Sequence, residues 1–265
     1  MTDDRIEGDG SDDPDRARRV RDDDDLATSL ADLAGLVSGA NGLDGLLKQV
    51  ATFAAHAIPG ADGAGVTLLR VDRSDNRVEA LAASHPFVSA IDEIQYVTLD
   101  EGPCITAADE RRTVHSGSLD EEKMWPHFGP RVGRMGVHSA LSLPLLLPGE
   151  VVGAINVYAR GKDAFDELAI EIGENFAGPA AVAVHNARLL AQALALTTQL
   201  QSALANRPVI DQAIGILRAR RGGTADEAFA RLRAISQHEH LRIVEVSQRV
   251  VAEAVGRARA RDADG

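Results

Sequence analysis

The arginines of the last seventy residues are the side chains best suited to bind a polyanion. Residues 196–265 contain 11 Arg and 8 acidic residues, whereas residues 26–195 contain 12 basic and 21 acidic residues. No lysine follows Lys162. The guanidinium group binds phosphate through two hydrogen bonds and stacks on unpaired bases, which suits a looped RNA. A basic segment on a chain of net charge −12 therefore predicts a nucleic-acid contact. The alternative is a solvated helical face with ordinary ion pairs.

Three amphipathic helices must position these arginines. Apolar residues recur at helical spacing in three stretches: 210–217, 229–236 and 243–254. Gly222 and Gly223 are expected to end the first helix, and Thr224 with Glu227 forms a capping box that begins the second. The residues expected in a shared core are Ile210, Leu217, Phe229 and Leu232. Short helices with one apolar stripe each can bury those stripes only against one another, so we predict a three-helix bundle.

The run from Asn206 to Leu217 resembles the ANTAR domain, the RNA-binding module of bacterial antitermination regulators. Further matching positions lie in the second helix: Ala225, Glu227, Ala228, Phe229, Leu232, Arg233 and Ser236. The resemblance covers about residues 196–255 and implies a three-helix RNA-binding domain. It makes seven arginines candidates for contact with phosphates and loop bases: Arg207, Arg218, Arg220, Arg221, Arg231, Arg233 and Arg242. The chain departs from the family at Ile214, where a lysine is common, and this removes one cation from the expected binding face.

Residues 26–190 are predicted to form a separate α+β domain that is long enough to bury its own core. A helix is expected around Leu43–Ile58, and a long helix capped by Asp163 is expected from about Phe165. Four apolar runs are predicted strands: 64–71, 77–84, 139–147 and 151–158. Pro148-Gly149-Glu150 joins the last two as a hairpin. This order favours an antiparallel sheet with helices on its faces.

The same region resembles a GAF domain, a common bacterial sensor fold, and in particular the subtype that precedes ANTAR modules in actinobacteria. The motifs that carry the resemblance are Gly102-Pro-Cys104, Trp125-Pro126 with Phe128, Gly136-Val-His-Ser139, Leu143-Pro144-Leu145 and Val152–Tyr158. The resemblance implies a ligand pocket between the sheet and the segment Asp100–His138. Its candidate residues are Cys104, Trp125, His127 and His138. The pocket could hold an unidentified small-molecule effector, or the domain could serve only dimerisation or protein contacts.

Each pocket candidate also has a plainer interpretation. Cys104 is the only cysteine, which excludes an internal disulfide and a Cys-x-x-Cys redox pair, and a lone cysteine is commonly a small buried residue. Trp125 is expected to pack rather than to stack on a ligand. The histidines lack metal-ligand spacing. Because no nucleophile is paired with a general base, the sequence predicts no catalytic residue, no metal site and no known cofactor.

The two ends of the chain are predicted to be disordered. Residues 1–25 are an acidic, aromatic-free tail, and residues 256–265 are assigned as a second tail. No run of eighteen apolar residues and no signal peptide is present, so we expect neither export nor a membrane span. One cysteine is consistent with the reducing cytoplasm.

A long connecting helix is predicted between the two domains, with Gly178-Pro179 as its kink point. Residues 180–204 form its connecting and dimerisation part, because the leucines there form a seam that resembles a coiled coil. A second copy of the same helix is the simplest partner that could bury this seam of leucines, which predicts a parallel homodimer. In the alternative, the seam packs on the chain's own sheet. Asn206 and Pro208 are expected to mark a new helix start or a kink.

These features predict a cytoplasmic RNA-binding regulator of transcription. The resemblance implies that it binds stem-loops in nascent leader RNA and stabilises them against a terminator hairpin, under control of the GAF domain. One alternative is a ligand-sensing or dimerisation protein whose ANTAR-like tail no longer binds RNA, which Ile214 motivates. The other is an enzyme that uses the GAF pocket, against which the absent nucleophile–base pair argues.

Overall fold

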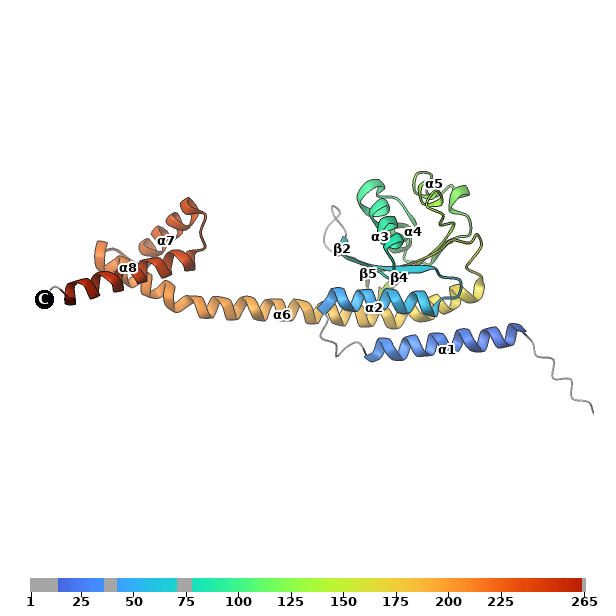
Figure 1. Cartoon of the computed structure of the whole chain (residues 1–265), viewed down its shortest axis with the longest axis horizontal. Helices are drawn as coiled ribbons and strands as arrows, with labels where there is room; N and C mark the ends of the chain where they lie inside the picture. The colour runs from blue at the N-terminus through green and yellow to red at the C-terminus, as the bar shows by residue number, and fades with distance from the viewer. Residues whose placement is uncertain (1–13, 36–41, 71–77, 264–265) are drawn as a thin grey trace, which may run out of the picture. The chain divides into compact units, whose positions relative to one another are not determined.

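The computed structural model describes residues 14–35, 42–70 and 78–263. The chain divides into two compact units, unit 1 over Met1–Ala191 and unit 2 over Gln192–Gly265. Unit 1 contains a five-stranded antiparallel sheet with helices on its faces, and the described part of unit 2 is helical (Figure 1). The predicted α+β class, with a long helix and further helices after the sheet, is confirmed.

The sheet has the strand order β2-β1-β5-β4-β3, and every neighbouring pair is antiparallel. The strands are β1 Gly63–Leu69, β2 Val78–Ala83, β3 Val114–Ser116, β4 Ser139–Leu147 and β5 Glu150–Ala159. β4 and β5 form the predicted hairpin, and Gly149 in its turn has a φ of 82°, a conformation that favours glycine. β5 therefore lies at the centre of the sheet, between β1 and β4.

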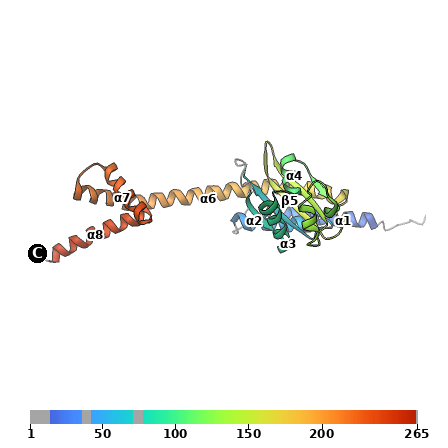
Figure 2. The same ribbon diagram turned by 90° about the horizontal axis from the view of Figure 1, so that it is seen from above.

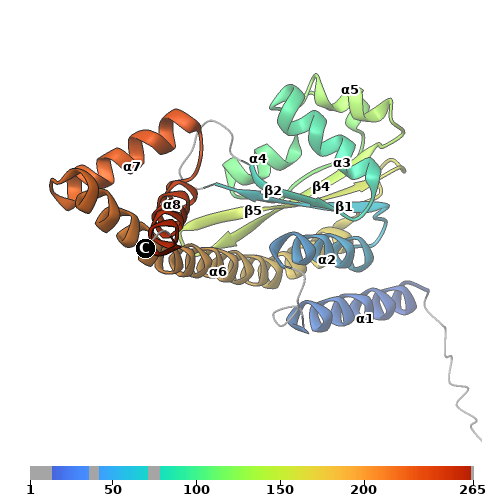
Figure 3. The same cartoon turned by 60° about the vertical axis from the view of Figure 1, so that its left-hand side comes forward.

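One face of the sheet is apolar and packs on two helices, α2 (Gly42–Ala57) and the first part of α6 (Glu167–Arg221). Alternate strand residues such as Leu68, Leu143 and Ile155 point into this core and are fully buried. Figure 3 shows α2 and α6 below the strands, with α1 (Pro14–Gly35) outside α2. This layer is the main hydrophobic core of unit 1.

Short helices cover the opposite face of the sheet. They are α3 Pro86–Glu93, the π-helix η2 Ile94–Leu99, α4 Pro103–Glu110, the 3-10 helix η3 Leu119–Glu121 and α5 Phe128–Gly133. A second core, which includes Trp125, Phe128 and Tyr158, lies under them. The segment between Asp100 and His138 is thus built from α4, β3, η3 and α5 with their connections.

The prediction of disordered tails was wrong for residues 14–25 and 256–263. Residues 14–25 form the first half of α1. The second half buries Leu33 against α2, and this packing stabilises the helix, including its charged first half. Arg18 also pairs with Asp22 at 3.7 Å and with Asp166 at 3.2 Å. Residues 256–263 continue α8 (Ile243–Ala263). Residues 1–13 and 264–265 lie outside the described residues.

Helix α6 differs from the prediction at its start and at its expected breaks. The carboxylate of Asp166, not that of Asp163, caps it by accepting a hydrogen bond of 2.9 Å from the Ala169 N–H. Asp163 instead has a φ of 50° and lies in the preceding turn. The helix runs on as one element of 55 residues through Pro179 and Pro208, each of which removes one helical hydrogen bond without ending it.

Unit 2 consists of the last part of α6, α7 (Ala225–Glu239) and α8 (Figure 2). The predicted turn is present: Gly222 and Gly223 both have positive φ, and the Thr224–Glu227 capping box begins α7. The buried residues shared by the three helices are Ala213, Leu232, Val246 and Val250. The assignment of Phe229 to this core was wrong, because its side chain stays 41% exposed. Ala228, which lies one helical turn before Leu232, is fully buried instead.

Candidate nucleic-acid interface

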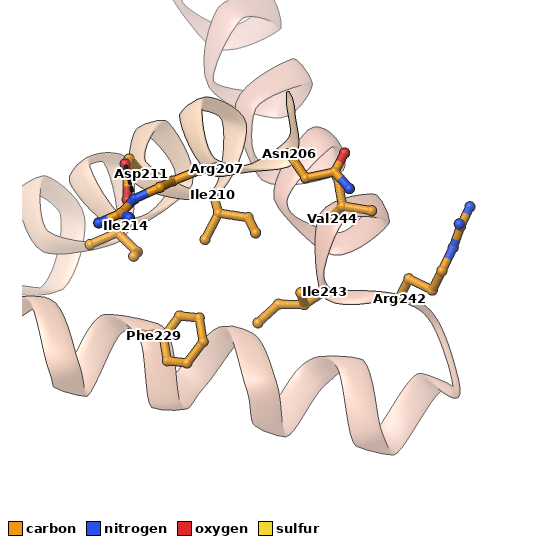
Figure 4. A pocket seen from close by; sticks show the side chains of 9 residues that line it. All are labelled: Asn206, Arg207, Ile210, Asp211, Ile214, Phe229, Arg242, Ile243 and Val244. Carbon is orange, nitrogen blue, oxygen red and sulfur yellow. Dashed lines mark ion pairs between the residues drawn. The ribbon is translucent and has the colours of Figure 1, made fainter. Parts of the chain in front are cut away.

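A groove of about 500 Å³ lies between the three helices of unit 2. Its lining comes from α6, α7, α8 and the residue before α8: Asn206, Arg207, Ile210, Asp211, Ile214, Phe229, Arg242, Ile243 and Val244. Figure 4 shows Ile210 and Ile214 pointing from α6 toward Phe229 on α7, with Ile243 at the side. We call this surface the α6–α8 groove. It has an apolar floor with charged side chains at its edge.

The aromatic ring of Phe229 is the most informative residue of this groove. It is held on a well-capped helix, yet 41% of its surface remains open to solvent. A half-exposed ring beside branched aliphatic side chains forms a flat apolar surface on which an unpaired nucleic-acid base can stack. The sequence pattern placed Phe229 in the core, because helical spacing cannot distinguish a buried face from an apolar groove at its edge.

Two arginines border the groove, and both already have acidic partners. Arg207 Nε lies 3.8 Å from Asp211 Oδ2, one turn along α6. Arg242 donates from Nε and Nη2 to Glu245 Oε1, at 2.9 and 2.7 Å. These hydrogen bonds from Arg242 lower the pKa of Glu245 below its usual value. Figure 4 shows the Arg242 guanidinium pointing away from the apolar floor, so its charge faces the rim.

Three further predicted arginines remain without an acidic partner near the groove. Arg218 and Arg221 recur at spacings of three or four residues after Ile214, so they continue the groove-facing side of α6. Arg233 lies one helical turn after Phe229 on α7. All three are exposed. Within the described ranges, the one hydrogen bond or ion pair found for them is a 3.3 Å hydrogen bond from Arg218 Nε to the Gly223 carbonyl. Their remaining N–H groups are available to donate hydrogen bonds to a phosphate.

The other two predicted arginines are placed differently. Arg220 is exposed, but its spacing from Ile214 puts it on another side of α6. Arg231 is partly buried in the bundle, and its Nη1 atom has no hydrogen-bond partner in the described part of the chain. Of the seven arginines predicted, Arg207 and Arg242 line the groove, and helical spacing puts Arg218, Arg221 and Arg233 on the sides of α6 and α7 that face it.

Ile214, where the ANTAR pattern often has lysine, lies in the floor of the groove. The substitution therefore exchanges a cation for apolar surface opposite Phe229. The groove thus has more apolar surface and one charge less than the family pattern predicts.

The four predicted pocket residues of unit 1 do not share one cavity wall. Cys104 is buried, with its Sγ in contact with the Tyr96 hydroxyl. Trp125 is also buried, and its Nε1 donates to Thr106 Oγ1 at 2.9 Å. The interpretation of both as packed residues agrees with this placement.

Of the two histidines of that set, His127 is exposed and His138 is half-buried. His127 Nδ1 is 2.9 Å from Glu101 Oε2, with its side chain 74% exposed. Burial acts to raise the pKa of Glu101, but hydrogen bonds from the Phe128 and His127 N–H groups and from the His127 ring lower it below the usual value. His138 Nδ1 is 2.9 Å from Asp120 Oδ2. Both rings thus lie within hydrogen-bonding distance of a carboxylate at the edge of the helical layer.

In the described ranges, no group of three or more His, Cys, Asp or Glu is arranged to hold a metal ion. No helix of the same residues combines the length and the hydropathy that crossing a membrane requires.

Comparison with known families finds two matches in this chain. A model of the GAF domain matches residues 40–185, and a model of the ANTAR domain matches residues 198–251. The first covers the sheet and its helices, and the second covers the α6–α8 groove and its arginines. A comparison with curated proteins finds no match.

Solved structures similar to unit 1 are GAF domains and related proteins. One is the GAF domain of a phosphoenolpyruvate-protein phosphotransferase from Coxiella burnetii, with 18% identity and a TM-score of 0.50, covering 62% of this chain and 95% of that chain. Another is the corresponding domain from Acinetobacter, with 16% identity and a TM-score of 0.47 over 63% of this chain and 97% of that chain. A third is a free methionine-R-sulfoxide reductase from Neisseria meningitidis in complex with its substrate, with 16% identity, a TM-score of 0.48, and coverage of 62% and 91%. At these identities the similarity shows the fold alone.

Proposed function

Because this chain belongs to the GAF domain family and an ANTAR match follows its GAF domain, we propose that it is an RNA-binding regulator of transcription. In this proposal unit 2 binds stem-loops in nascent leader RNA, and unit 1 receives the controlling signal. The single observation that supports it best is the α6–α8 groove, in which a half-exposed Phe229 lies with Arg207 and Arg242 at the edge. Three more arginines follow its lining residues at helical spacing: Arg218, Arg221 and Arg233.

The geometry of the groove suggests how a hairpin loop is recognised. One unpaired loop base stacks on Phe229 against the apolar floor. Arg218, Arg221 and Arg233 neutralise phosphates on either side, which makes the affinity dependent on salt. A paired stem offers no base to the groove, so recognition is restricted to the loop. Two adjacent stem-loops held in this way resist an overlapping terminator hairpin, and polymerase reads through.

A parallel homodimer would present two such grooves to two loops. Six leucines along α6 are each more than half exposed: Leu189, Leu190, Leu194, Leu196, Leu200 and Leu204. Their exposure shows that no described residue covers this stripe. A second copy of the same helix would bury the stripe as a coiled coil, with Thr197 and Gln201 as weaker seam positions.

Replacing Leu190 and Leu194 together with glutamate is expected to convert the dimer to a monomer. The two side chains would bring four like charges into one seam of the dimer, which we expect to raise the dissociation constant at least about a hundredfold. Sedimentation velocity over a range of protein concentrations measures this directly. Gln192→Glu with Gln199→Glu adds the same charge on the opposite side of the helix and should leave the dimer intact. A dimer that persists in the leucine variant would reject this interface.

This regulator is of the type in which an actinobacterial GAF domain precedes an ANTAR module, and it acts in the cytoplasm, where nascent transcripts are made. A small-molecule effector or the dimer contact itself controls it. Unit 1 would shift an equilibrium between two arrangements of the pair of grooves, one that can hold two loops at once and one that cannot.

Replacing Phe229 with alanine is the sharpest test of the groove. Loss of one base–aromatic stack costs about 1–3 kcal/mol, so affinity for a two-hairpin RNA selected from a pool should fall at least about fivefold. Because Phe229 is 41% exposed, the bundle should stay folded, which circular dichroism can verify. Phe229→Tyr keeps the ring and should retain binding. If the alanine variant binds as tightly as the wild type, the base does not stack there. If the wild type selects no RNA at all, unit 2 has lost this function, as the alternative based on Ile214 expects.

A further inference from the structure

The lining of the α6–α8 groove contains an acidic side chain, which a surface that binds only phosphates does not need. Asp211 is the one acid among the described residues that line the groove, and its side chain is 63% exposed. A carboxylate repels phosphate, and it can only accept hydrogen bonds. Asp211 therefore indicates a ligand that also offers a hydrogen-bond donor at the edge of the groove.

Asp211 forms an open pair with Arg207, one helical turn before it on α6. Arg207 Nε and Asp211 Oδ2 are 3.8 Å apart, which is longer than a hydrogen bond, and the Arg207 side chain is 78% exposed. Among the described residues neither side chain has a hydrogen-bond partner. Arg242 differs, because it donates to Glu245 at 2.9 and 2.7 Å. The Arg207–Asp211 pair thus presents donor N–H groups and acceptor oxygens side by side.

Stability does not explain this arrangement. An exposed ion pair one helical turn apart contributes little to the free energy of unfolding. An ordinary pair on a solvated helical face is the alternative, and it predicts no effect on the ligand. The position of Arg207 and Asp211 in the lining of the groove favours a role in binding.

Gly215 continues the side of α6 that carries Asp211. It lies four residues after Asp211 and directly after Ile214, so helical spacing places it beside the groove. A Cβ atom on Gly215 would meet no atom within 4 Å. A glycine inside a helix is destabilising relative to alanine, and no turn or crowded neighbour among the described residues requires one here. The bare backbone at Gly215 leaves space for a bulky group of a ligand to lie close to α6.

We propose that Arg207, Asp211 and Gly215 form a ribose contact through which unit 2 distinguishes RNA from DNA. Asp211 accepts a hydrogen bond from the 2′-hydroxyl of a loop nucleotide, and Arg207 donates to the phosphate that follows the same sugar. Gly215 leaves room for the sugar against the helix. The 2′-hydroxyl and the 3′-phosphate are neighbours on one nucleotide, so they match the acceptor and the donors of the pair. This inference rests on the proposed function, because it assigns a sugar contact in the same groove.

The place of the pair beside the apolar floor favours a sugar over a base as its partner. Figure 4 shows Arg207 and Asp211 side by side on α6, next to Ile214. A base stacked on Phe229 fills the floor, and the ribose joined to it lies at the edge of the groove. An exocyclic amino group is the other donor that RNA offers to a carboxylate, and the test below separates the two.

The first test compares two forms of one two-hairpin RNA selected by the full-length protein, one with ribose throughout and one with 2′-deoxy loop nucleotides. A hydrogen bond to a charged group is lost in the second form, so the wild type should bind it at least about tenfold more weakly. Asp211→Ala should reduce this ratio to about one. Because the variant also loses a negative charge, both affinities increase alike, and the ratio remains the informative quantity.

Glu253→Ala is the matched control for this variant. Glu253 lies on α8, is exposed, and pairs with an arginine one helical turn away, Arg257, at 3.4 Å. Its removal changes the net charge by the same amount, but it is not among the residues that line the groove. We therefore expect the preference for ribose to stay at its wild-type value.

The second test replaces Gly215 with alanine and uses Gly256→Ala as its control. Gly256 lies inside α8, and a Cβ atom there would also meet no atom within 4 Å. Both variants should raise the Tm, because alanine favours the helix. Only Gly215→Ala should weaken binding of the all-ribose RNA, at least about fivefold, because its methyl group occupies the space of the sugar. Sedimentation velocity should find the oligomeric state unchanged; an altered state would assign Gly215 to a contact between copies and overturn this part of the proposal.

The outcomes separate this contact from the proposed function. Hairpin RNA bound with equal affinity in both sugar forms would overturn the ribose contact and leave RNA binding intact. A preference for ribose that persists in Asp211→Ala would show that Asp211 is not the acceptor. If Asp211→Ala weakens both forms equally, the carboxylate accepts from a base and the proposal is wrong. If the wild type selects no RNA, the proposed function fails and this contact fails with it.

Discussion

Replacing Arg218, Arg221 and Arg233 together with alanine is expected to weaken RNA binding about 100-fold in about 0.1 M salt. Each arginine that neutralises a phosphate of single-stranded RNA contributes about 0.7 to the slope of log K against log salt. At this salt concentration one such contact corresponds to about fivefold in affinity, and three correspond to about 100-fold. The slope itself should decrease by about 2. These three side chains are chosen because they are exposed, follow groove-lining residues at helical spacing and have no acidic partner among the described residues.

A matched variant separates this contact from the effect of net charge. Arg257, Arg259 and Arg261 lie near the end of α8 and are also exposed. Replacing these three with alanine removes the same charge but should change affinity less than about tenfold, because only long-range attraction is lost. Fluorescence anisotropy with labelled two-hairpin RNA at several salt concentrations measures both quantities. Equal losses in the two variants would mean that the arginines act as a diffuse charge and not as a site.

Replacing Asp92 with asparagine is expected to remove a large pH dependence of stability. Asp92 lies on α3 and is only 2% exposed, and this burial raises its pKa in the folded protein to about 7, against 3.8 for an exposed aspartate. The folded state therefore holds this proton more tightly than the unfolded state. The stabilisation of the folded state by this proton is fully present below about pH 4, and it is lost as pH rises through 7. At about 1.4 kcal/mol for each tenfold change in proton affinity, the wild type should lose up to about 4 kcal/mol across this window.

Urea unfolding at pH 5, 6, 7 and 8 tests this prediction, with the unfolding of unit 1 followed by the fluorescence of Trp125. Other groups titrate equally in both proteins, so the difference between the wild type and Asp92→Asn isolates the buried carboxyl group. We expect that difference to shift in favour of the variant as pH rises. Parallel stability curves would show that Asp92 is ionised, and paired, in the folded state.

The sequence predicted those parts of the fold that depend on local patterns. Two apolar runs around Pro148-Gly149 define the β4–β5 hairpin, and Thr224 with Glu227 defines the start of α7. Hydrogen bonds within a few residues determine both features, so the local sequence pattern is sufficient to predict them. Local spacing likewise predicted the helices that carry most of the seven arginines, although Arg242 lies just before α8.

The parts that were not predicted depend on contacts between distant residues. Residues 14–25 have the composition of a disordered tail, and they are helical because the other half of α1 packs on α2. Phe229 has helical core spacing, but the three helices diverge beside it and leave a groove. One face of the sheet also buries polar side chains, and this face was hidden because β1 and β5 contain largely buried, continuous runs. The alternation of Gly63, Gly65 and Thr67 with aliphatic residues was the one signal that could have revealed it.

The central claim is that unit 2 recognises the loops of RNA hairpins, and one comparison tests it most directly. The affinity of the full-length protein is measured for a two-hairpin RNA and for a fully paired RNA duplex of equal length and charge, at two salt concentrations. Since the duplex offers phosphates but no unpaired base for Phe229, we predict binding at least about tenfold weaker than to the hairpins, with the preference kept at high salt. Equal affinity for both RNAs, lost in parallel as salt increases, would contradict loop recognition and reduce the groove to an ordinary basic surface.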